Sequence, residues 1–153
     1  MDLYEVLDNL QIFYQEVRHP KVCTVLEMQK LHLDIQGIGC KNLFLKAKDH
    51  YYLYVLEENK RADLKFLARF LQVSHLSFAS EEELQNILGL EKGSVTPLGI
   101  LHDKQNLVTI LLDKDLVGKK ILVHPNRNDR TLSLSFDDLL KVIQYLHHGY
   151  YLI

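Results

Sequence analysis

The sequence lacks the short motifs with which many enzymes bind metals or nucleotides. It contains no HExxH, no CxxC and no glycine-rich P-loop, and these motifs supply zinc ligands or a cradle for phosphates. No serine lies in a nucleophile elbow, and neither Cys23 nor Cys40 lies in a pattern that pairs it with a histidine. His147 and His148 are adjacent, so on a helix they would point apart rather than share a metal. We therefore expect no metal, no cofactor and no covalent catalysis.

Cysteines and long apolar runs are also scarce. Two cysteines in a chain without an export signal indicate reduced thiols inside a cell. No apolar run approaches the roughly 20 residues needed to cross a bilayer. The N-terminus is acidic and amphipathic, whereas a secretory signal has a basic segment before an apolar one. These features predict a cytoplasmic protein with no membrane partner.

The chain carries little net charge and no linker. The formal net charge is −2, which excludes a protein that coats nucleic acid through a large basic surface, because such binding depends on many phosphate contacts. A protein that touches only the end of an RNA remains compatible with this charge. The 153 residues are 47% hydrophobic and 25% charged, which is typical of one globular domain with a full core. Because no Pro/Gly/Ser-rich stretch or repeat divides the chain, we predict a single domain over residues 1–153.

Hydrophobic periodicity and capping signals predict an alternation of helices and strands. Helices are expected over residues 2–19, from Thr24 onward, over residues 61–71 and 80–88, and from Ser135 to about residue 147. Strands are expected over residues 40–45, 51–56, 107–112, 120–124 and 131–134, with a further strand attached to the loop within 93–101. The strands come mostly as hairpins, with helices set between them in groups. This order favours an α+β domain over a doubly wound parallel sheet.

The segment from Cys40 to Lys46 is the first candidate for a functional site. Side chains alternate along a strand, so Asn42 and Lys46 share one face and Lys41 lies where the strand begins. A half-buried strand does not need a Lys-Asn pair at its start, whereas a pocket that holds a phosphate or a polar acyl group does. Taken alone, Lys41 and Lys46 would be interpreted as solvated lysines at the ends of a strand.

Two further segments have both a functional and a structural interpretation. In Gly93–Pro97, glycine allows unusual backbone angles and proline fixes one angle. The loop could thus be rigid, with its N–H groups free to orient a carbonyl or a water, or it could be an ordinary turn. His124 lies at the end of a predicted strand, where it could cover a pocket or could pack and bond structurally.

Five segments in this order resemble the YbaK/prolyl-tRNA synthetase-associated editing domains, and especially the free-standing aminoacyl-tRNA deacylases of the ProX or PrdX type. The segments are His19–Thr24, Cys40–Lys46, Leu76–Leu84, Gly93–Gly99, and His124-Pro125 with Asn128 and Thr131. The resemblance covers about residues 19–146 and implies a mixed, largely antiparallel central sheet with flanking helices. Two positions depart from the family. Many relatives carry histidine at the position of Gly39 and an aromatic residue at the position of Cys23.

The resemblance implies hydrolysis of the ester that joins a wrong amino acid to a tRNA. Alanyl-tRNA(Pro) is the expected substrate, because a pocket sized for proline cannot strongly exclude a smaller side chain and a second sieve must remove the product. The expected partner is the acceptor end of the tRNA, and prolyl-tRNA synthetase is a second candidate partner. The alternatives are an enzyme that acts on Cys-, Ser- or Thr-charged tRNA, and a non-catalytic module that binds an aminoacyl-tRNA end.

The resemblance also implies roles for individual residues. Lys41 would contact a phosphate of the terminal adenosine, or the ester, as a point charge rather than as a base. Lys41, Gly93 and Pro97 are the expected catalytic residues. The remaining expected contacts to the acceptor end and the acyl group are Asn42, Lys46, Ser94, Val95, Thr96, Gly99, His124 and Asn128. The ribose 2′-hydroxyl of the substrate and an oriented water would replace a side-chain base.

Overall fold

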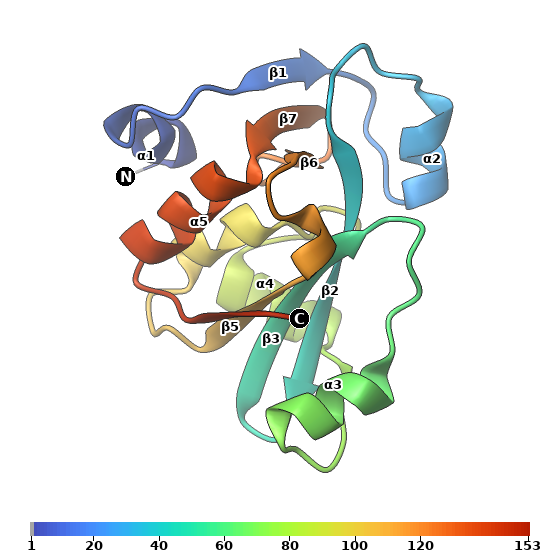
Figure 1. The fold of residues 1–153 in the computed structure, drawn as a ribbon, viewed down its shortest axis with the longest axis vertical. Coiled ribbons are helices and arrows are strands. Elements are labelled where there is room, and N and C mark those ends of the chain that lie inside the picture. Colours follow the sequence, from blue (N-terminus) through green and yellow to red (C-terminus); the bar gives the residue numbers. More distant parts are fainter. Residues whose placement is uncertain (1) are drawn as a thin grey trace.

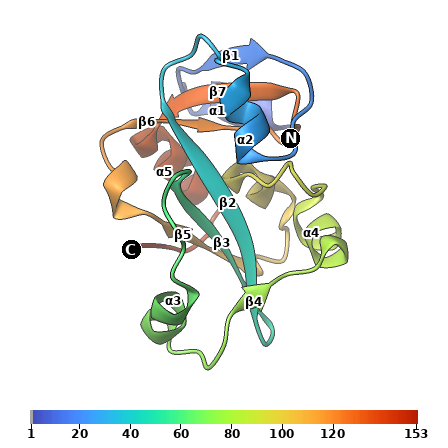
Figure 2. The same ribbon diagram turned by 90° about the vertical axis from the view of Figure 1, so that its right-hand side faces the viewer.

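An antiparallel hairpin of two long strands, β2 (Ile38–Ala47) and β3 (His50–Glu57), runs through the middle of the molecule (Figure 2). The computed structural model describes residues 2–153, so the domain boundary expected at Met1 lies outside them. The strands are joined by a tight turn in which Lys48 has a φ of 55°. Both predicted strands are confirmed.

The sheet has eight strands and mixed directions. Its order is β1 (Gln15–Arg18), β7 (Arg130–Ser135), β6 (Lys120–Val123), β2, β3, β5 (Val108–Leu112) and β8 (Tyr150–Leu152), with the short β4 (Ser77–Phe78) paired to β2. Four of the seven strand pairings are antiparallel. Ile38 and Gly39 at the start of β2 pair with β6, while the rest of β2 pairs with β3. The predicted α+β fold with a largely antiparallel sheet is confirmed.

Helices flank this sheet, and their N-termini follow the capping signals of the sequence. The helices are α1 (Leu3–Asn9), α2 (Val25–Lys30), α3 (Leu64–Leu71), α4 (Glu81–Leu88), α5 (Phe136–Tyr145) and two 3-10 helices, η1 (Pro97–His102) and η2 (Lys114–Leu116). The side chains of Thr24, Ser80 and Ser135 each accept a hydrogen bond from the backbone N–H three residues later. Gly89 ends α4 in the left-handed conformation, with a φ of 64°.

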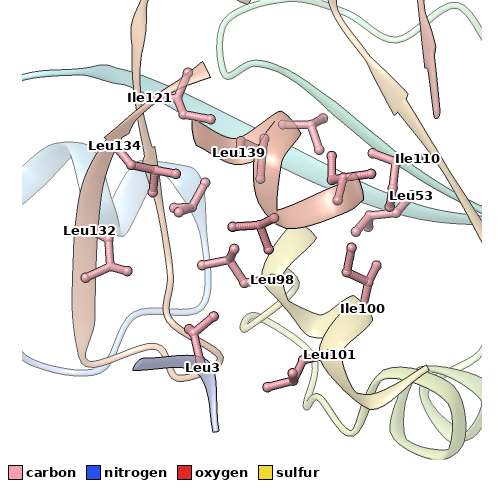
Figure 3. Close-up of a cluster of buried hydrophobic side chains, with 14 of the residues drawn as sticks. Leu3, Leu53, Leu98, Ile100, Leu101, Ile110, Ile121, Leu132, Leu134 and Leu139 are labelled. Atoms are coloured by element: carbon pink, nitrogen blue, oxygen red, sulfur yellow. The ribbon is translucent and has the colours of Figure 1, made fainter. Parts of the chain in front are cut away.

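Apolar side chains cover both faces of the central strands. One cluster joins the sheet to α5, η1 and α1, and the other packs α3 against the opposite face. Figure 3 shows part of the first cluster, with Leu53, Ile110, Leu132, Leu134 and Leu139 among its members. Burial on both faces explains why the segment of β3 carries an almost unbroken apolar and aromatic run.

The first predicted helix, over residues 2–19, is wrong in its second half. The helix ends at Asn9, Gln11 adopts a left-handed φ of 55°, and the Ile12 N–H returns to the Leu7 carbonyl at 3.0 Å. This is the geometry of a Schellman-type helix end, for which glycine is the usual signal. The following residues form β1 against β7, a long-range pairing that helical periodicity does not encode.

The strand predicted within residues 93–101 is also wrong. Residues 97–102 form η1, in which the Thr96 hydroxyl accepts a hydrogen bond from the Leu98 N–H at 3.3 Å. Leu98, Ile100 and Leu101 are all buried. Because this short apolar run is buried on every side, its residue pattern does not distinguish a strand from a tight helix.

The two ends of the β2–β3 hairpin have different surroundings. Figure 1 shows α2 beside the start of β2, and α3 at the opposite end near the β2–β3 turn. The C-terminal residues add β8 to β5 in parallel, so this apolar tail packs on its own chain. Among residues 2–153, no helix has the length and apolar character that crossing a membrane would need.

Candidate active site

A cavity of about 600 Å³ lies at the start of β2, between α2 and the ends of β6 and β7. Its walls come from five parts of the chain that are far apart in sequence. The lining residues are Val22–Val25, Met28, Gln29, His32, Leu33, Ile35, Gly37, Gly39–Leu43, Glu58, Gly93, Val95, Leu122–His124 and Thr131. Of the residues predicted for the site, this cavity brings together Lys41, Asn42, Gly93, Val95 and His124.

Lys41 and Asn42 are neighbours on β2 and differ in how they are held. Lys41 is one of the residues that line the cavity, and within residues 2–153 its ammonium forms neither an ion pair nor a hydrogen bond. The Asn42 amide Nδ2 donates to the Val95 carbonyl at 3.2 Å, which ties β2 to the loop that follows α4. Lys41 is therefore a cation available to a ligand, while Asn42 fixes one wall of the cavity.

The loop at Gly93–Thr96 packs closely against neighbouring segments of the chain. Gly93 has a φ of 88°, and a Cβ there would lie 2.9 Å from the Cys23 Cα, so only glycine fits. The Thr96 hydroxyl donates to the His124 carbonyl at 2.7 Å. The N–H groups of Gly93 and Val95 donate no hydrogen bond to any residue between 2 and 153. Two backbone donors on cavity-lining residues are thus unused.

His124 is held with one ring nitrogen free. Its Nδ1–H donates to the Arg130 carbonyl at 2.8 Å, and nothing among the described residues bonds to Nε2. Burial lowers the pKa of His124, an effect that the bond to Arg130 only partly opposes. The ring is therefore neutral at pH 7, with Nε2 as a hydrogen-bond acceptor.

A second histidine lies next to His124, and the sequence interpretation gave it no role. The His19 ring is 6.1 Å from the His124 ring, centroid to centroid. Its Nδ1 lies 2.8 Å from the Pro20 carbonyl, and its Nε2 lies 2.8 Å from the Thr131 hydroxyl. Because a carbonyl only accepts, Nδ1 carries a proton and donates to Pro20, while Nε2 shares a hydrogen bond with the Thr131 hydroxyl. His19 thus orients a residue on the cavity wall.

Cys40 also lines the cavity but is not placed as a nucleophile. Burial raises the pKa of the Cys40 thiol to about 12, so the reactive thiolate is essentially absent at neutral pH. Among residues 2–153, no group of three or more His, Cys, Asp or Glu side chains is placed to hold a metal ion.

Five of the predicted site residues lie near the cavity but do not line it. Thr96, Pro97 and Gly99 are buried around η1, where a Cβ on Gly99 would lie 2.6 Å from Leu90. Ser94 and Asn128 line a second hollow of about 320 Å³, which also contains Lys21 and Arg127. Asn128 Nδ2 donates to the Val22 carbonyl at 2.9 Å. These residues support the loops that form the cavity.

Lys46 lies at the other end of β2. Strands rise by about 3.3 Å per residue, so its Cα is roughly 16 Å from that of Lys41. Its ammonium is 2.7 Å from the Glu83 carboxylate and lies over the Tyr51 ring at 5.8 Å. Hydrogen bonds from Lys46, from the Ser80 backbone and from Tyr51 lower the pKa of Glu83 to about 2. Lys46 joins β2 to the start of α4 and does not reach the cavity.

The sequence interpretation missed most of the wall formed by α2, and it missed Glu58. Gln29 and Met28 come from α2, which carries no motif and has no buried residue of its own. Glu58 follows β3 and approaches the cavity only because its N–H bonds to the Gly39 carbonyl at 3.0 Å. In the sequence, the only hint of a carboxylate at this place was Gly39, which lies opposite Glu58 and leaves room for its side chain.

Comparisons with known proteins agree with this site. The sequence profile described as "Aminoacyl-tRNA editing domain" matches residues 19–142. The prolyl-tRNA editing protein ProX of Acetoanaerobium sticklandii is 42% identical over 142 residues, which cover 90% of this chain and 86% of that protein. The prolyl-tRNA synthetase associated domain-containing protein 1 of Danio rerio is 33% identical over 151 residues, covering 96% of this chain and 82% of that protein.

A solved structure shares the fold. It is described as a candidate trans-editing enzyme for prolyl-tRNA synthetase and superimposes with a TM-score of 0.70 at 22% identity, covering 91% of this chain and 85% of that one. The profile match includes every wall of the cavity, and the ProX protein is similar over nearly its full length. The chain therefore belongs to the aminoacyl-tRNA editing domain family, and it is an aminoacyl-tRNA deacylase.

Proposed function

We propose that this protein, acting as one editing domain over residues 1–153, removes alanine from mischarged tRNA(Pro) in trans. One observation carries the proposal beyond the family: a free cation at Lys41, unused backbone donors at Gly93 and Val95, and a neutral imidazole at His124 border the same cavity. These groups match the phosphate, the ester carbonyl and the side-chain end of the acyl group of an aminoacylated adenosine.

The reaction adds water to the ester carbonyl, breaks the bond to the ribose oxygen and releases the free amino acid and the tRNA. Negative charge develops on the carbonyl oxygen, where the N–H groups of Gly93 and Val95 can stabilise it. The Lys41 ammonium holds a phosphate or the ester oxygen by charge. The ribose 2′-hydroxyl and His124 Nε2 can together orient the attacking water. Thr96, Pro97 and Gly99 act indirectly, by keeping the loop rigid.

The cavity selects its amino acid by size in this proposal. The walls near His124 are fixed because the Thr96 hydroxyl donates to the His124 carbonyl and the His124 ring donates to the Arg130 carbonyl. These walls therefore resist the widening that the larger proline ring would need. A hydrophobic pocket separates side chains that differ by one methylene by about 10- to 200-fold. The acceptor end of the tRNA is the partner that enters the cavity. Contact with prolyl-tRNA synthetase and a cytoplasmic location remain predictions that follow from the substrate.

A panel of charged tRNAs tests the proposed function. Purified protein is incubated with alanyl-, cysteinyl-, seryl-, threonyl- and prolyl-tRNA, and the release of amino acid is followed. We expect alanyl-tRNA(Pro) to be hydrolysed fastest and prolyl-tRNA(Pro) to be spared. Faster release of cysteine, serine or threonine would contradict the alanyl specificity and would identify that aminoacyl ester as the substrate. Binding without any release would refute the proposed reaction.

The variant His124→Ala should change selectivity more than stability. Removing the imidazole widens the acyl end of the cavity, so the ratio of alanyl to prolyl deacylation should fall by about ten-fold or more. The lost bond to the Arg130 carbonyl should reduce the free energy of unfolding by only about 0.5–1.5 kcal/mol. Deacylation rates on both esters and a thermal melt measure the two effects. His75→Ala, at an exposed histidine outside the cavity, serves as the control, and an unchanged ratio in His124→Ala would contradict the role.

A further inference from the structure

The Glu58 carboxylate occupies space that a side chain at Gly39 would fill. A Cβ on Gly39 would lie 2.3 Å from Glu58 Oε2 and 2.7 Å from Oε1, far inside van der Waals contact. The backbone bond from the Glu58 N–H to the Gly39 carbonyl keeps the two residues opposite each other. Because position 39 has no side chain, a carboxylate forms this part of the cavity wall.

One oxygen of Glu58 is held and the other is free. Oε1 accepts a hydrogen bond from Gln29 Nε2 at 3.2 Å, which fixes the carboxylate against α2. Oε2 accepts no hydrogen bond within residues 2–153. Glu58 is half-buried and lines the same cavity as Lys41, yet the two charges form no ion pair. The cavity therefore presents a separate anion and cation to its ligand.

We propose that Glu58 binds the α-ammonium of the aminoacyl group, a role that rests on the proposed function. An α-amino group is protonated below about pH 8, and a charge-assisted hydrogen bond to a carboxylate is roughly twice as strong as a neutral one. The same carboxylate repels phosphates, so the nucleotide would lie on the Lys41 side and the acyl group on the Glu58 side. Glu58 thus orients the substrate by charge, while His124 limits its size.

An isosteric substrate without the charge tests this role. In lactyl-tRNA(Pro) a hydroxyl replaces the α-ammonium of alanyl-tRNA(Pro), and the ester is otherwise unchanged. We expect the wild-type protein to prefer the alanyl ester by at least about ten-fold in kcat/KM. The variant Glu58→Gln keeps the shape of the side chain, so it should lose most of this preference by raising KM for the alanyl ester alone. Gly39→Ala, which displaces the carboxylate, should have the same effect.

The control is Glu57→Gln, which removes the same charge one residue earlier. Glu57 bonds to Asn59 and does not line the cavity, so the preference for the alanyl ester should persist. A full alanyl preference in folded Glu58→Gln, or an equal loss in Glu57→Gln, would overturn the assignment. If the wild-type protein hydrolyses neither ester, the proposed function itself fails, and the two failures are thereby distinguished.

Discussion

The variant Lys41→Ala is expected to deacylate alanyl-tRNA(Pro) at least 100-fold more slowly than the wild-type protein. Removing one preorganised electrostatic contact from an active site reduces kcat by about 10²–10³-fold, and Lys41 is the free cation that the described cavity offers. The fold should persist, because within residues 2–153 the ammonium forms no hydrogen bond or ion pair that alanine would break. Single-turnover deacylation and a thermal melt measure the two effects.

The same strand provides a matched control. Lys46→Ala removes the same charge from β2 at a point that faces Glu83 instead of the cavity. It should keep its deacylation rate while the start of α4 becomes less firmly held. Lys41→Arg should recover little activity, because a planar guanidinium does not replace a compact ammonium in a shaped site. Full activity in Lys41→Ala, or an equal loss in Lys46→Ala, would remove the central role given to Lys41.

The largest loss of stability is expected for His148→Ala. His148 Nε2 lies 2.9 Å from the Asp103 carboxylate, with side chains 2% and 1% exposed, and Nδ1 lies 3.0 Å from the Leu146 carbonyl. Removing the imidazole leaves the buried Asp103 carboxylate with only its backbone N–H partners, and breaking a buried pair in this way costs about 3–5 kcal/mol. For a chain of this size the melting temperature should fall by about 6–20 °C. Hydrogen exchange should increase first in β8, which begins two residues after His148.

The variant His147→Ala is the control for His148→Ala, because it removes the same kind of side chain from the neighbouring position. His147 is exposed and has a φ of 60°, which His147→Ala leaves unchanged, so its melting temperature should fall only slightly. A loss in His148→Ala no greater than this would contradict the role of the buried pair.

The same pair makes stability depend on pH on the acid side. Burial alone would raise the pKa of Asp103, but hydrogen bonds from His148 and from the N–H groups of Leu107 and Val108 outweigh it and hold the pKa below its usual value. The pair therefore stabilises the fold above the usual pKa of an aspartate, and this stability is lost as the pH falls through the lowered value.

The sequence predicted most of the fold because many signals were local. Capping at Thr24, Ser80 and Ser135 depends on residues within one helical turn, and the structure confirms each cap. The error over residues 2–19 has the opposite origin. There, apolar spacing continued past a helix end that is set by Gln11 without a glycine, and β1 exists only because β7 lies beside it.

The candidate site was predicted in part, and the reason lies in how the cavity forms. Lys41, Asn42 and the glycine of the loop could be identified because they lie in segments whose order along the chain resembles the editing-domain family. Glu58 and Gln29 could not be identified in this way, because an exposed Glu and Gln are common anywhere. Their positions depend on the approach of α2 and β3 to one another across the start of β2.

The sequence by itself determined the family, the α+β class and the lysine most expected to act, since motif order and hydrophobic pattern are properties of neighbouring residues. Only the tertiary structure decided that Lys46 lies outside the cavity and that Thr96 and Pro97 are buried beside the cavity without lining it. It also decided that the Glu58 carboxylate fills the space that a side chain at position 39 would take. Such placements depend on pairing between segments that are distant in the chain, and residue types alone do not specify which face of a strand meets which neighbour.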